Sequence, residues 1–192
     1  MSLRDLVLRN RSCRRFRANM PVAQAVLQDL VDMARFTPSA GNKQPLKYIM
    51  ACDPAANTKI FPCLSWAAYL QDWDGPEEGD RPAAYIVILG DTRIASSFGC
   101  DHGIAAQTIM LGATELGLAG CMVASIDRDR LRAALGIPDP LEILLVLALG
   151  KAGETVMLEP VNDGNIRYWR DEHDRHHVPK RSLEEITVEI GP

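Results

Sequence analysis

The stretch from Asp101 to Leu116 most strongly constrains the fold, because apolar residues occur on nearly every side of the helix that its spacing predicts. A helix that lacks a polar face must be surrounded by other elements. The chain has 192 residues, 47% of them hydrophobic, and can bury such a helix in one core. We therefore expect one domain spanning residues 1–192, with this helix at its centre.

Apolar periodicity predicts most of the other elements. The predicted strands cover residues 47–52, 84–90, 121–125, 143–150 and 185–190. The predicted helices cover residues 2–10, 22–34 and 127–135. Ser2 with Asp5, and later Asp127, are suitable N-caps, while Gly136 is a suitable C-terminal stop. Helices and strands mix without strict alternation, which predicts an α+β fold. The strand at the C-terminus needs a sheet edge, and that edge could belong to a second chain.

Two segments between these elements are candidates for functional loops. Residues 37–45 are rich in turn-forming residues, and such loops between regular elements often carry function. Residues 67–82 combine five acidic side chains with aromatic ones. We interpret this second segment as a mobile excursion that could act as a lid.

Composition excludes several classes of protein. The formal net charge is −4 and the pI is about 5.6, so nothing favours a nucleic-acid partner. The strongest apolar stretch, Leu141 to Leu149, is too short to span a bilayer, which predicts no membrane insertion. Five scattered cysteines without a CxxC pair are typical of reduced thiols, so we expect a cytoplasmic protein. We expect Cys52 and Cys121 to be buried structural residues.

Basic residues gather near both ends of the chain. Arg11, Ser12 and Arg14 supply two guanidinium groups and a hydroxyl at the end of the first helix, and Lys180 and Arg181 lie near the other end. Guanidinium groups with a hydroxyl can hold a phosphate through charge-assisted hydrogen bonds. The alternative interpretation is a solvated basic surface.

Several motifs occur in an order that resembles the nitroreductase family of flavoenzymes. The first two are the R-S-x-R box at residues 11–14 and P-S-x-x-N-x-Q-P at residues 38–45. Residues 101–121 resemble the family's long central helix and its exit, residues 147–151 a later core strand, and residues 178–185 the closing segment. The resemblance implies a central, mostly antiparallel sheet flanked by helices, with the C-terminal strand extending onto the partner subunit.

The resemblance also implies a cofactor and a quaternary structure. FMN would lie at the interface of a homodimer, and NADH or NADPH would reduce it. Arg11, Ser12 and Arg14 would hold the FMN phosphate, ribityl chain and pyrimidine edge, and Lys180 and Arg181 would hold the phosphate. The isoalloxazine ring would be lined by a loop of the partner subunit and by a main-chain N–H near flavin N5. These residues are Pro38, Ser39, Ala40 and Asn42 for the loop and Ala124 for the N–H.

The chain departs from the family pattern in three places. Many members carry arginine where this chain has Asn10, and glycine is common where it has Ala124. Residues 67–82 match none of the helices that cover the substrate in the family. The identity of the small-molecule electron acceptor therefore stays open.

The resemblance implies ping-pong hydride transfer from NAD(P)H through FMN to a nitro compound or quinone. Flavin N5 would carry the chemistry, so no catalytic side chain is assigned. Two alternatives stay open: another flavin reaction, such as reductive dehalogenation or dehydrogenation, and a non-enzymatic flavin-binding protein. NADH against NADPH, and two- against four-electron reduction, also stay open.

Other motifs favour simpler interpretations. His173, His176 and His177 could suggest a metal site, but adjacent histidines point apart on a strand, and we interpret all three as solvated tail residues. Gly117 and Gly120 do not complete a dinucleotide-binding fingerprint. We interpret Met110 and Met122 as core residues. No local signature supports Cys13 or Cys100 as a nucleophile.

Overall fold

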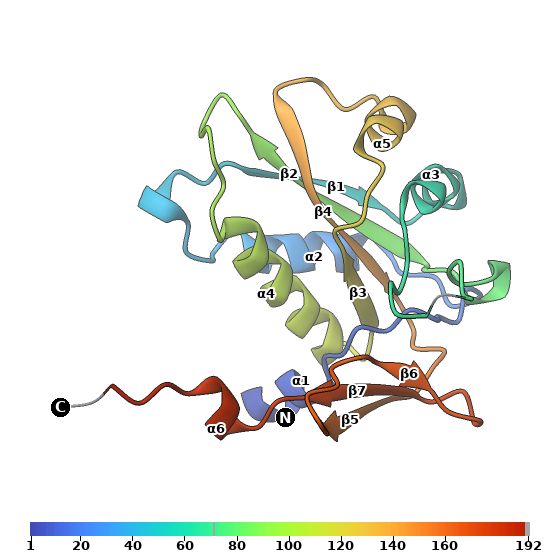
Figure 1. Cartoon of the computed structure of the whole chain (residues 1–192). Coiled ribbons are helices and arrows are strands. Elements are labelled where there is room, and N and C mark those ends of the chain that lie inside the picture. The colour runs from blue at the N-terminus through green and yellow to red at the C-terminus, as the bar shows by residue number, and fades with distance from the viewer. Residues whose placement is uncertain (71, 191–192) are drawn as a thin grey trace.

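The computed structural model describes residues 1–70 and 72–190. Its main sheet has four antiparallel strands in the order β1-β2-β4-β3, formed by β1 (Leu46–Ala51), β2 (Ala84–Asp91), β3 (Ala119–Val123) and β4 (Leu141–Gly150). Helices cover both faces (Figure 1), so the predicted α+β fold with a flanked antiparallel sheet is confirmed. Within the described residues no helix is long and apolar enough to cross a membrane.

Strand β2 shows why these residues form a central strand. Each of its eight residues is buried, because helices pack on both sides. Ile86 and Ile88 face α2 (Gln24–Ala34) and α4 (Asp101–Glu115). Tyr85, Val87 and Leu89 face the side covered by α3 (Pro54–Ile60) and α5 (Arg128–Leu135). Side chains alternate between faces along a strand, so a strand covered on both faces is continuously apolar.

The helix ends follow local capping rules. Ser2 and Asp5 form the expected capping box of α1 (Leu3–Arg9), Asp127 caps α5, and Gly136 ends α5 in the left-handed conformation at φ 63°. Helix α3 was not predicted, although Asp53 caps it and Pro54 occupies its first turn.

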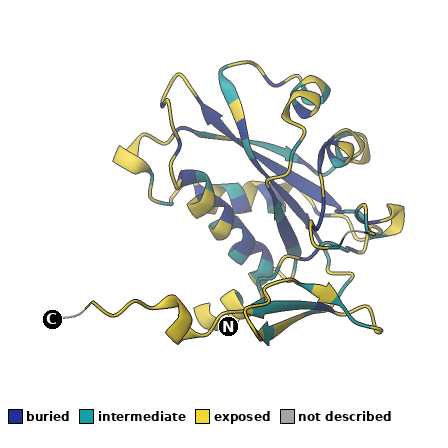
Figure 2. Cartoon of the chain, viewed as in Figure 1, coloured by how far each residue is buried: buried dark blue, intermediate teal, exposed yellow. Residues whose placement is uncertain are grey.

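The central helix α4 is only partly enclosed. Seven of its residues are buried, and Ala105, Ile109 and Ala113 among them pack in the core cluster between the sheet and α2. Gly103, Ile104 and Gln107 are exposed in the single chain, so the expectation of a helix covered on all sides is wrong for this strip (Figure 2).

A second, smaller sheet was not predicted. It contains β5 (Val156–Pro160), β6 (Trp169–Arg170) and β7 (His176–Lys180) in the order β5-β7-β6, with β5 parallel to β7. It lies below the main sheet, beside α1, in Figure 1. Short 3-10 turns cover Ala40–Asn42 (η1), Phe61–Cys63 (η2) and Glu78–Asp80 (η3).

The predicted C-terminal strand over residues 185–190 is wrong at its start. Ser182 and Glu185 form a capping box that begins α6 (Leu183–Ile186), and no regular element follows within the described residues. Residues 187–190 extend away from the body (Figure 1). Val188 and Ile190 are 88% and 94% exposed, so this arm has no covered face in the single chain. Although apolar residues alternate along the arm, the arm does not pair with a sheet within the single chain.

The segment 67–82 is attached to the body at several points. Trp66, immediately before it, is buried, and main-chain N–H groups of Phe16 and Ala18 donate to the carbonyls of Asp80 (2.8 Å) and Gly79 (3.2 Å). The side chain of Trp73 lies beside Arg170, whose guanidinium carbon is 4.4 Å from the ring centroid. The lid interpretation stays a prediction.

Candidate functional site

The basic N-terminal segment lies along the edge of the main sheet. Asn10 ends α1 and donates from its side-chain amide to the Met110 carbonyl (3.0 Å) and the Thr114 hydroxyl (2.9 Å), both on α4. Ser12 then forms a parallel bridge with Gly120 of β3. A Cβ on Gly120 would lie 2.7 Å from the carbonyl oxygen of Ala148, so only glycine fits here. The predicted strand at 121–125 therefore begins earlier, at Ala119, and ends at Val123.

A buried carboxylate fixes the next part of the segment. Glu154 accepts the main-chain N–H groups of Arg14 (2.5 Å) and Arg15 (3.1 Å) and pairs with the Arg170 guanidinium at 3.0 Å. Its side chain is 2% exposed. Gly153 beside it packs so closely that a Cβ would lie 2.9 Å from the main chain of Phe16. The loop 151–155 thus joins the N-terminal segment to the small sheet.

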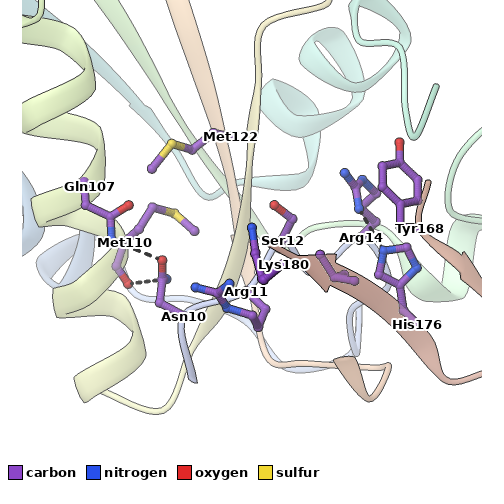
Figure 3. A pocket seen from close by; sticks show the side chains of 11 residues that line it. Asn10, Arg11, Ser12, Arg14, Gln107, Met110, Met122, Tyr168, His176 and Lys180 are labelled. Carbon is purple, nitrogen blue, oxygen red and sulfur yellow. Dashed lines mark hydrogen bonds between the residues drawn. The ribbon is translucent and has the colours of Figure 1, made fainter. Parts of the chain in front are cut away.

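A pocket of about 320 Å³ opens where α1, α4, β3 and β7 meet. Four of the predicted phosphate or cofactor residues, Arg11, Ser12, Arg14 and Lys180, line it (Figure 3). The remaining lining residues are Asn10, Gln107, Met110, Met122, Tyr168, His176 and Val178. Residues from opposite ends of the chain therefore meet at one site.

The pocket carries positive charge that no carboxylate of the described residues neutralises through an ion pair. Among the described residues, Arg11, Arg14 and Lys180 form no ion pair. Arg11 donates through Nη2 to the Val7 carbonyl at 2.8 Å, while its buried Nε has no partner in the described part of the chain. Burial lowers the pKa of the Arg11 guanidinium. An anion is the ligand that such a donor set favours.

Two other predicted cofactor residues, Ala124 and Arg181, do not line this pocket. Ala124 follows the end of β3 and lines an adjoining pocket of about 260 Å³, which shares Arg14, Met122 and Tyr168 with the first. Arg181 is exposed, pairs with Glu185 at 3.2 Å and does not line either pocket. The capping box of α6 explains this placement, because it puts Glu185 one helical turn after Arg181.

The loop expected to cover the flavin ring lies elsewhere in the same chain. Pro38 and Ser39 line a separate pocket of about 170 Å³ together with Asp101. The Ser39 hydroxyl and the Ala40 N–H donate to the Asp101 carboxylate at 2.6 and 3.0 Å, and Asn42 is exposed, with φ 54°. Asp101 begins α4, whereas Met110 faces the first pocket about 13 Å further along, at about 1.5 Å per helical residue. One chain does not bring this loop to Arg11 and Arg14.

Two residues of the site had no predicted role in it: Tyr168, which matches no motif, and His176, which was assigned to a solvated tail. His176 is fully buried, so its assignment as a solvated tail residue is wrong. His177 is half-buried between Glu159 (2.8 Å) and Asp171 (3.1 Å), whereas the side chain of His173 is 66% exposed. The alternation of β7 explains the difference, because neighbouring residues face opposite sides of a strand. Within the described residues, no three His, Cys, Asp or Glu side chains gather in a way that could hold a metal ion.

Cysteine and methionine side chains near the site are buried or line the pocket. Burial, with Glu154 nearby, raises the pKa of the Cys13 thiol to about 12, so this thiol stays neutral. Cys121 is buried as predicted, whereas Cys52 is only half-buried. Met110 belongs to the core as expected, but it also lines the pocket with the partly buried Met122.

The chain is similar to several known proteins. The sequence model of the nitroreductase family matches residues 7–151. A protein from Thermus thermophilus named NADH dehydrogenase is 24% identical, over 80% of this chain and 88% of its own. A Streptococcus pneumoniae nitroreductase family structure aligns with a TM-score of 0.72 at 14% identity, over 98% of this chain and 100% of its own. A structure from Exiguobacterium sibiricum, described as a putative nitroreductase in complex with FMN, aligns with a TM-score of 0.66 at 17% identity, over 80% of this chain and 90% of its own. Because the family model spans most of this sequence and the fold agrees, the chain belongs to the nitroreductase family.

Proposed function

We propose that this protein is an FMN-dependent oxidoreductase that takes hydride from NADH or NADPH and passes it, in ping-pong order, to a nitro compound or quinone. The observation that carries the proposal is the pocket in which Arg11, Ser12, Arg14 and Lys180 meet. Family membership and the FMN complex of the Exiguobacterium sibiricum protein support the choice of cofactor.

The residues of the pocket fit the anionic part of FMN. The buried Nε of Arg11 lacks an acceptor within the described chain, and a phosphate oxygen would supply one. Lys180 and Ser12 line the same pocket and would complete a charge-assisted set of donors. Arg181, which pairs with Glu185, would need to change its rotamer to join them.

When bound, FMN would supply the atom that accepts and donates hydride. Arg14 lines both pockets, so its positive charge would stabilise the electron-rich edge of a reduced ring. The main-chain N–H of Ala124, at the end of β3, would orient the ring from the adjoining pocket. Because none of these roles requires a general acid or base, we assign no catalytic side chain.

We also propose a homodimer with FMN at the subunit interface. Pro38, Ser39, Ala40 and Asn42 would then line the ring from the partner subunit, since within one chain they lie near the start of α4. The exposed strip of α4 and the exposed Val188 and Ile190 of the arm at 187–190 leave surfaces that a second copy would cover. Electron transfer between small molecules requires no membrane or nucleic acid, and we place the protein in the cytoplasm.

Anaerobic mixing with nicotinamide cofactors tests the activity. FMN-loaded protein should lose its oxidised-flavin absorbance with NADH or NADPH, and a nitroaromatic or quinone should restore it. Absorbance that persists with both nicotinamides would contradict the proposal and leave a flavin-binding protein without nicotinamide turnover. A dehalogenation substrate in the same acceptor panel would reveal the other flavin chemistry.

Cofactor retention tests the site. Arg14→Ala should weaken FMN binding by about 1.5 to 3 kcal/mol, the usual range for a hydrogen bond to a charged group. His173→Ala, at an exposed position, is the matched control. Unchanged FMN occupancy in Arg14→Ala would refute the assignment, and a diluted monomer that retained FMN would refute the interface location.

A further inference from the structure

The Arg14 side chain is held by two neutral groups from the small sheet and the loop before it. Its guanidinium carbon lies 4.9 Å from the centroid of the Tyr168 ring, a cation–π distance. Its Nη1 lies 3.3 Å from Nε2 of His176. The Tyr168 and His176 rings are themselves 5.2 Å apart, and Figure 3 shows all three side chains on one side of the pocket. The guanidinium is thus located by groups that leave its charge available to an anion.

The main chain of Arg14 is fixed by a different contact. Glu154 accepts its main-chain N–H, as it does that of Arg15, and Arg170 neutralises that carboxylate. The position of the Arg14 backbone therefore depends on Glu154, whereas the direction of its side chain depends on Tyr168 and His176. A substitution at His176 can therefore change the direction of the Arg14 guanidinium without moving the Arg14 backbone.

The surroundings of His176 favour the neutral ring. The side chain is fully buried, and the charged or titratable groups that act on it are Glu154, Arg14, Arg170 and His177. Burial lowers the pKa of His176 to about 4; Glu154 opposes this shift, and the two arginines and His177 add to it. Neither ring nitrogen bonds a carboxylate within the described chain, since Nε2 faces Arg14 and Nδ1 has no partner there. A neutral ring can accept an N–H at Nε2.

We propose that His176 is a positioning residue: its neutral Nε2 accepts an N–H from Arg14 and, with the Tyr168 ring, directs the guanidinium toward the anionic ligand. Protonation of Nε2 places two donors opposite each other, so Arg14 loses this contact in acid. The inference rests on the proposed function, because it requires FMN as the anion. It adds His176 and Tyr168 to the residues that determine cofactor affinity.

FMN binding to the apoprotein, followed by quenching of flavin fluorescence, tests this role. His176→Leu removes the acceptor and should weaken binding about tenfold at neutral pH, the effect of losing a modest hydrogen bond to a charged group. His176→Gln provides an amide oxygen near the position of Nε2 and should stay within about threefold of the wild type. His173→Gln, at an exposed position, should bind as the wild type does.

The pH profile distinguishes positioning from a merely structural role. The loss of wild-type affinity that comes from His176 should begin below about pH 5 and grow toward about pH 4, where the ring takes up a proton. The FMN phosphate also takes up a proton, at about pH 6, so the informative quantity is the difference between wild type and His176→Gln. The Gln variant should show the smaller loss in acid, because only the phosphate titrates.

A double-mutant cycle provides the second measurement. In an Arg14→Ala background, His176→Leu should change the FMN dissociation constant less than about twofold, because its partner is gone. Additive effects, equal acid profiles of the wild type and His176→Gln, or unchanged binding by a folded His176→Leu would each overturn the proposal. A wild-type chain that binds no FMN would overturn the proposed function, and this inference with it. If His176→Leu does not fold, the acid profile of His176→Gln decides the question.

Discussion

The two sheets are held together by different forces. The main sheet buries apolar side chains on both faces, and all eight residues of β2 are covered. In the small sheet only His176 is fully buried, and its strands and turns are joined by pairs such as Arg170 with Glu154 and His177 with Glu159. The main sheet therefore supplies stability, whereas the small sheet places charged and aromatic groups beside the pocket. Its geometry should respond to pH and to single charge changes.

The largest expected effect is a truncation in the main sheet. Leu147 on β4 is fully buried between the sheet and helices α2 and α4, so Leu147→Ala should lower the free energy of unfolding by about 4 kcal/mol. Leu158→Ala on β5, where the side chain is 38% exposed, should cost less than about 1 kcal/mol. Urea unfolding followed by circular dichroism measures both. Equal losses would contradict the contrast between the sheets.

The next effect concerns the buried charge that connects the two regions. Glu154→Gln leaves Arg170, whose side chain is 12% exposed, with only the exposed Asp174 carboxylate at 4.0 Å, and should cost about 3 kcal/mol. Glu172→Gln is the matched control, because the Glu172 side chain is 87% exposed and should contribute almost nothing. The same urea titration applies. An unchanged midpoint for Glu154→Gln would show that apolar packing alone holds the small sheet.

The smallest effect is the opposite pH response of two adjacent histidines. Hydrogen bonds to Glu159 and Asp171 raise the pKa of His177 above 6.5, so its stabilisation is present below that pH and is lost as pH rises through the folded-state pKa. Burial lowers the pKa of His176 to about 4, so stability is lost as pH falls from 6.5 toward 4.

Thermal unfolding across this pH range checks the signs. His177→Gln should remove part of the loss above pH 6.5, and His176→Gln part of the loss below it. We expect the His177 effect to be slight, since Glu159 is 33% exposed and water screens the pair. Profiles that changed in the same direction for both variants would refute the assignment of opposite shifts.

The sequence predicted the main sheet well because its pattern is locally readable. Continuous apolar runs identified β2 and β4, and capping residues such as Ser2 and Asp127 identified helix starts. Strand β3 begins earlier than predicted because Gly120 was assigned to the exit of the central helix, whereas it permits close packing against β4. Helix α3 was missed although the signal of Asp53 followed by Pro54 was present.

The small sheet was missed for a physical reason. Its strands are short, charged and only partly buried, so they lack the apolar alternation that indicates a strand. Their pairing joins residues 156–160 to 176–180 in parallel, a long-range contact that no local pattern specifies. The roles of Tyr168 and His176 were missed for the same reason, since both roles depend on contacts with Arg14, which lies far away in the sequence.

The sequence by itself determined which groups could bind an anion, because side-chain charge and hydrogen-bonding capacity are properties of the residue types. It also determined the strands that are apolar on both faces and the helices that carry one apolar stripe, because these patterns are visible in the sequence. Only the tertiary structure decided that Arg11, Ser12, Arg14 and Lys180 share a pocket while Arg181 pairs with Glu185. It likewise decided that His176 is buried and its neighbour His177 is paired, because burial and partners arise from contacts between distant segments.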